Sequence, residues 1–146
     1  MNILHILATE KKKTVRRAMR RVKFVLEYLL NTTSDDILWE FIGTAAGLES
    51  WFADKVVIDG REVTFQWEGD EPRKARITSQ RPYQNITFKW LDSPDAHEFF
   101  ELKMIAGDLT PEYILQVIDF ANEDEVDDMK ELWDTQIETL RRTAGF

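Results

Sequence analysis

The chain has 146 residues, of which 43% are hydrophobic and 12% aromatic, and its formal net charge is −8. This length and composition fit one globular domain with a core built around large rings. The chain has no cysteine, which excludes disulfides, thiolate zinc sites and thiol nucleophiles, and no apolar run approaches the roughly 18 residues needed to span a bilayer.

Residues 1–21 differ from the remainder, and we expect them to form a basic extension outside the domain of residues 22–146. They hold seven of the 19 Lys and Arg residues but only Glu10 among the 27 acidic residues. An apolar patch precedes the basic cluster, which is the reverse of the order in a secretory signal. A flexible tail, a short added helix, an upstream-extended start and a polyanion-binding arm remain open alternatives. Residues 22–146 are strongly acidic, so we expect no nucleic-acid binding through them.

The first predicted strand covers residues 22–30, where alternate residues are apolar: Val22, Phe24, Leu26, Tyr28 and Leu30. A polar break ending in N-cap residues then predicts two short helices, over residues 37–42 and 44–52. Short strands follow at regular spacing, over residues 55–58, 62–67, 74–80, 85–90, 97–106 and 112–120. This spacing is typical of an antiparallel meander.

An amphipathic helix is predicted to end the chain. Its apolar residues recur every three or four positions and form one stripe: Val126, Met129, Trp133, Ile137 and Leu140. Asn122 is predicted to cap this helix, and Gly145 follows its last turn. The stripe needs a wide apolar surface, which only the upstream strands can supply. The sequence therefore predicts an α+β fold in which a curved antiparallel sheet of about seven strands wraps around the long C-terminal helix.

Four aromatic motifs carry a resemblance to a known family. They are Gly47-Leu48-Glu49-Ser50-Trp51-Phe52, Phe65-x-Trp67, Ile86-x-Phe88-x-Trp90 and Leu132-Trp133-x-x-x-Ile137-x-x-Leu140. With the element order, they resemble the START-like superfamily, also called SRPBCC, helix-grip or Bet v 1-like. The closer similarity is to the family named for homology to the activator of the heat-shock-protein-90 ATPase. The resemblance implies a cavity for lipids, sterols, polyketides or other apolar molecules, whereas a few relatives are cyclases and some bind a chaperone.

Large apolar side chains on the predicted inner faces form the candidate ligand site. They are Trp51, Phe52, Phe65, Trp67, Phe88, Trp90, Phe100, Met104, Met129, Trp133 and Ile137. Core packing is the alternative role for each of them taken singly. Gln116 and Asp119 on the last strand are candidate polar anchors. We expect a small apolar molecule, lipid-like or aromatic, to bind between the sheet and the helix with micromolar-class affinity.

No catalytic, metal or cofactor site is predicted. The chain lacks a Gly-x-Ser-x-Gly elbow, a phosphate-binding glycine loop and a His-Glu-x-x-His helix, and its acidic run lacks the pattern of a calcium loop. A protein-interaction or chaperone-regulating module is one alternative function. A cyclase-like enzyme with Tyr28, His97 or Asp119 as acid or base is another. We expect a cytoplasmic location, and the oligomeric state stays open.

Overall fold

The computed structural model describes residues 20–93 and 98–146. Within these ranges, seven strands form one antiparallel sheet in the order β1-β7-β6-β5-β4-β3-β2. The strands are β1 (Arg21–Leu29), β2 (Lys55–Asp59), β3 (Glu62–Gln66), β4 (Arg73–Arg81), β5 (Asn85–Trp90), β6 (Phe99–Ala106) and β7 (Tyr113–Asn122). Most of the predicted basic extension, and His97, lie outside the described residues.

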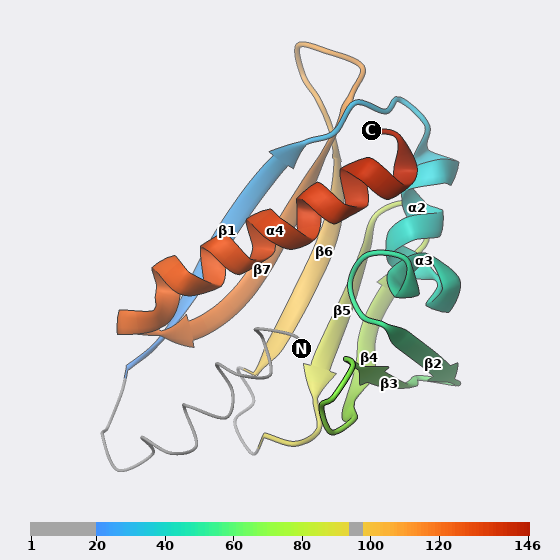
Figure 1. Cartoon of the computed structure of the whole chain (residues 1–146). Helices are drawn as coiled ribbons and strands as arrows, with labels where there is room; N and C mark the ends of the chain where they lie inside the picture. The colour runs from blue at the N-terminus through green and yellow to red at the C-terminus, as the bar shows by residue number, and fades with distance from the viewer. Residues whose placement is uncertain (1–19, 94–97) are drawn as a thin grey trace.

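The helices lie on one side of this sheet. They are α2 (Asp35–Gly43), α3 (Ala45–Glu49), the 3-10 turn η1 (Glu123–Glu125) and α4 (Val126–Ala144). Figure 1 shows α4 running across the sheet, with α2 and α3 beside its C-terminal end. The predicted α+β helix-grip order of strand, two short helices, six strands and long helix is confirmed. No helix in the described part of the chain is both long and apolar enough to cross a membrane.

The alternation of side chains along each strand decides which residues face α4. On β1, Phe24 is buried, whereas Val25 and Leu29 are exposed on the outer face. On β7, Leu115 is buried on the same side of the sheet as Phe24. The β2–β3 hairpin closes at Gly60, which has a φ of 62° that suits a residue without a Cβ. The sheet thus presents one continuous apolar face to the helix.

Helices α2 and α3 form a tight corner at one end of the sheet. The side chain of Ser34 accepts a hydrogen bond from the Ile37 N–H at 3.2 Å, and that of Thr44 accepts one from the Gly47 N–H at 3.0 Å, so each helix has an N-cap. A Cβ on Gly47 would lie 1.8 Å from the Glu40 carbonyl oxygen, so only glycine allows the two helices to approach this closely. The corner directs the following residues, Trp51 and Phe52, into the interior.

The junction between β7 and α4 differs from the prediction. Asn122 does not cap α4: it is the last residue of β7, and its side-chain oxygen accepts a hydrogen bond from Arg21 Nη1 at 3.1 Å. The turn η1 carries the chain from the sheet onto the helix, and Glu125, at the N-cap of α4, makes no side-chain capping bond. At the other end Gly145 adopts a left-handed φ of 75° and its N–H donates to the Arg141 carbonyl, as its position predicts.

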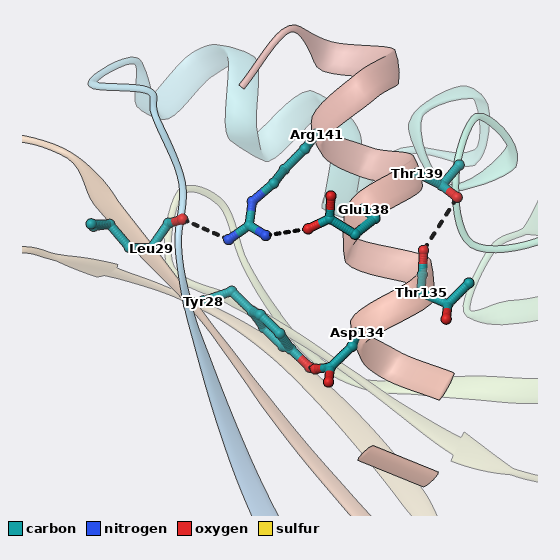
Figure 2. A network of polar contacts seen from close by, with 7 residues as sticks. All are labelled: Tyr28, Leu29, Asp134, Thr135, Glu138, Thr139 and Arg141. Atoms are coloured by element: carbon teal, nitrogen blue, oxygen red, sulfur yellow. Dashed lines mark hydrogen bonds and ion pairs between the residues drawn. The ribbon is translucent and has the colours of Figure 1, made fainter. Parts of the chain in front are cut away.

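Polar contacts hold α4 along β1 (Figure 2). The Tyr28 hydroxyl donates to Asp134 Oδ1 at 2.6 Å, and Arg141 donates to the Leu29 carbonyl at 3.0 Å while pairing with Glu138 at 2.6 Å. Partial burial and the Asp134 carboxylate raise the pKa of Tyr28 well above its ordinary value. Tyr28 therefore stays protonated at neutral pH and its proton is engaged by Asp134.

Candidate functional site

Phe52 occupies the centre of the space between the sheet and α4. Its ring centroid lies 5.2 Å from that of Phe65, 5.7 Å from Trp67, 5.1 Å from Phe100 and 5.7 Å from Trp133. These neighbours come from β3, the segment after it, β6 and α4, so one ring joins the sheet to the helix. Each such pair contributes about 0.5–1.5 kcal/mol beyond the area it buries.

The remaining rings extend this cluster across the sheet. Phe88 on β5 stacks on Phe100 at 4.9 Å and meets Phe65 edge-on at 5.5 Å. Every apolar residue chosen for the candidate ligand site is buried in the same core, including Met104, Met129 and Ile137. The rings therefore contact one another rather than facing an open space, and a ligand must lie beside the cluster or displace a ring.

The two polar candidates on β7 lie on opposite faces of the sheet. Gln116 alternates with the buried residues Leu115 and Val117, so it lies on the outer face and does not enter the space below α4. Asp119 lies on the inner face, where its Oδ2 accepts a hydrogen bond from Trp133 Nε1 at 2.9 Å and its Oδ1 accepts one from the Phe120 N–H at 2.7 Å. Asp119 thus orients the indole of Trp133, and the position of Gln116 corrects the sequence-based prediction.

A hollow of about 330 Å³ opens beside the ring cluster, between the end of β3, the segment after α3 and one flank of α4. Its buried lining consists of Trp51, Phe52, Ala53, Trp67 and Gln136, and its more exposed lining of Glu49, Ser50, Asp54, Glu68 and Thr139. The volume falls within the range of about 300–1,000 Å³ that small-molecule sites occupy. The hollow is open and exposes mainly polar surface, and the rings of its buried lining contribute the smaller share.

Hydrogen bonds hold the walls of this hollow in place. Trp67 Nε1 donates to the Phe52 carbonyl at 2.9 Å, and Asp54 Oδ2 accepts from the Glu68 N–H at 2.6 Å. Glu49 Oε1 accepts from the Val56 N–H at 3.2 Å. Because these bonds link the α3–β2 segment to the end of β3, the mouth is formed before any ligand arrives.

Gln136 is the buried polar residue of this site that the sequence analysis does not predict, and the exposed residues of the mouth are not predicted either. Gln136 is 8% exposed, lines the hollow, and its side-chain amide makes no hydrogen bond to residues 20–93 or 98–146. The burial of Gln136 could have been predicted, because residue 136 follows Trp133 by three positions and therefore lies on the same, buried side of the helix. The predicted stripe consists of apolar residues alone and therefore does not include this glutamine.

The candidate acid–base residues are not brought together. Tyr28 contacts Asp134 on the β1 side of α4, Asp119 orients Trp133, and neither residue lines the hollow. His97 lies outside the described residues. Among those that are described, no group of three or more His, Cys, Asp or Glu residues is placed to hold a metal ion.

Comparisons with known proteins agree with this architecture. The family model described as "START-like superfamily domain" matches residues 18–146. The solution NMR structure of BfR322 from Bacteroides fragilis is 52% identical, with the match covering 88% of this chain and 94% of that chain at a TM-score of 0.63. No curated protein matches significantly.

Two more distant structures show a likeness of fold alone. The Aha1 dimer from Colwellia psychrerythraea is 12% identical, with 82% of this chain and 92% of that chain covered at a TM-score of 0.65. CalU16 from Micromonospora echinospora is 14% identical, with coverages of 85% and 82% and a TM-score of 0.60. The family match spans the sheet, the ring cluster and α4, and on this ground the chain belongs to the START-like superfamily.

Proposed function

We propose that this protein binds a small apolar or aromatic molecule in the hollow beside Phe52. The observation that carries the proposal is the continuity between the hollow and the ring cluster. Phe52 lines the hollow with Trp51 and Trp67, and it also stacks on Phe100 and Trp133. These three rings are almost fully buried, so a ligand in the hollow gains full contact with them only if a ring such as Phe52 rotates aside.

The size of the hollow limits both the ligand and its affinity. A ligand that buries about 300 Å² of apolar surface gains roughly 7–8 kcal/mol. Ordering and association costs remove several of those kcal/mol, which leaves micromolar-class binding. The proposal includes no chemical step, since Tyr28 and Asp119 are engaged in hydrogen bonds elsewhere.

Two substitutions on α4 test the site. Thr139 lines the hollow, whereas Thr135 lies one turn earlier and does not, and each hydroxyl donates to a backbone carbonyl four residues before it. We expect Thr139→Trp to fill the hollow and weaken binding of the uncharged dye N-phenyl-1-naphthylamine about ten-fold, with Thr135→Trp as the matched control. Dye fluorescence measures the affinity. Absence of dye binding to the folded protein, or equal weakening by both variants, would refute the proposal.

Protein interaction is the second candidate function, and the exposed apolar residues of β1 favour it. Val25 and Leu29 are 46% and 57% exposed on the outer face, in register with Ile118 and Ile114 of β7. The related Colwellia structure is described as a dimer. We propose that a second copy of this chain covers this apolar patch on the outer face of β1 and β7. Light scattering should then show a dimer that Leu29→Lys dissociates, and a monomer at all concentrations would exclude it.

A further inference from the structure

The mouth of the hollow carries an excess of negative charge. Glu49, Asp54 and Glu68 line it from three different segments. Glu49 and Asp54 each accept a backbone N–H, and within the described residues none of the three carboxylates pairs with a Lys or Arg side chain. Arg142 does not line the hollow; it donates to Oγ1 of Thr139, a lining residue, at 3.4 Å.

An independent observation comes from inside the hollow. Gln136 is more than nine-tenths buried, lines the hollow, and leaves its amide without a hydrogen-bonding partner in residues 20–93 and 98–146. The amide is not among the fully buried polar atoms that lack a partner, so it reaches the open space of the hollow and is free to pair with a group that enters it. The amide oxygen offers an acceptor to a ligand N–H that reaches past the carboxylates.

We infer that the hollow selects an organic cation, an apolar molecule that carries a protonated amine, and this inference rests on the proposed function. Three carboxylates attract the ammonium group and repel an anion of the same shape. A bare metal ion does not fit, because the described residues offer no group of three His, Cys, Asp or Glu side chains placed to hold one.

Three ligands with the same apolar body separate charge from shape: 4-phenylbutylamine, 4-phenylbutan-1-ol and 4-phenylbutyrate. Isothermal titration calorimetry at pH 7 and low salt should rank the amine about ten-fold tighter than the alcohol, with the carboxylate weakest. The preference should shrink in about 1 M NaCl, where the screening length falls to roughly 3 Å. Amide resonances of residues 49–54 and 136–139 should shift with the amine.

Matched variants assign the preference to this site. Glu68→Gln should weaken amine binding about three-fold and leave alcohol binding unchanged, and Gln136→Leu should also weaken the amine. Glu131→Gln, which removes one charge from an exposed position of α4 outside the hollow, should change neither. Equal affinities for amine and alcohol, or a preference that survives Glu68→Gln, would overturn this inference and leave apolar binding intact. Failure of all three ligands and of N-phenyl-1-naphthylamine would instead overturn the proposed function.

Discussion

The Tyr28 hydroxyl joins β1 to α4 through its 2.6 Å hydrogen bond to Asp134 Oδ1. Burial of the ring and the adjacent carboxylate raise the pKa of Tyr28 above its ordinary value of 10.0. The folded state therefore holds this proton more tightly than the unfolded state does. The resulting stability is complete below about pH 10 and is lost as the pH rises toward the folded-state pKa.

Tyr28→Phe isolates this contribution. We expect the variant to lose about 1 kcal/mol in free energy of unfolding at pH 8, because one hydrogen bond is removed. Above about pH 10 the difference between wild type and variant should narrow, since only the wild type loses this bond to ionisation. Urea unfolding followed by circular dichroism from pH 8 to 11 measures both. A constant difference over that range would contradict the prediction.

For Gln136 we expect the opposite effect of a substitution, a gain in stability. Gln136→Leu replaces an amide that makes no hydrogen bond to the described residues with an apolar side chain of similar size at a mostly buried position, so we expect the free energy of unfolding to rise by up to about 1 kcal/mol. Gln66→Leu, at an exposed position of β3, serves as the control and should change stability by less than about 0.5 kcal/mol. A loss of stability in Gln136→Leu would show that the amide is satisfied in solution.

The sequence contained the information to place Gln116 correctly. Residues 116 and 119 are an odd number of positions apart, so they cannot face the same side of a regular strand. Asp119 shares its face with Val117, which is buried. The hydrogen bond from Trp133 to Asp119, in contrast, joins two elements and depends on how α4 lies on the sheet.

At the scale of elements, the positions of the strands and helices follow from the local sequence pattern, but the beginning of α4 does not. The prediction for Asn122 failed because Arg21, in register with it on β1, extends β7 to this residue and engages its side chain. A capping residue and a strand end look alike in a short window of sequence. The deciding partner lies 101 positions away and enters only through the fold.

The C-terminal end of α4 gives a prediction at this scale. Gly145 has a φ of 75°, and a Cβ added there meets no atom within 4 Å. Gly145→Ala should therefore cost only the backbone strain of a left-handed residue, about 1 kcal/mol. Urea unfolding measures the cost. A much larger loss would mean that the end of the helix packs against something when the protein is in solution.

At the scale of the whole molecule, the order of elements and the buried side of α4 were predictable, because both follow from periodicity. The central place of Phe52 was not. That ring reaches the interior through the α2–α3 corner, whose geometry depends on the close approach of Gly47 to Glu40. The hollow beside Phe52 depends on the same corner. The apolar pattern of the sequence therefore predicts the aromatic residues of the hollow but not the carboxylates at its mouth.

Phe52→Ala tests how far the whole structure depends on that ring. We expect a loss of about 3–5 kcal/mol in free energy of unfolding, with a larger hollow and tighter binding of N-phenyl-1-naphthylamine. Phe99→Ala is the control, because this half-buried ring lies on the outer face and contacts Phe120 at 4.9 Å. It should cost less and leave dye binding unchanged. If the two variants lost similar amounts of free energy of unfolding, Phe52 would not be the central ring of the core.

Within the part of the chain that the structure describes, strand β1 pairs with one strand, β7, and α4 lies against both. During translation β1 emerges early and must wait for β7, which is made about 100 residues later. At about 5–20 residues per second, that wait lasts roughly 5–20 s. Throughout it, Phe24 and Leu30 have no permanent cover. The nascent chain therefore exposes these two apolar side chains until its last third has emerged.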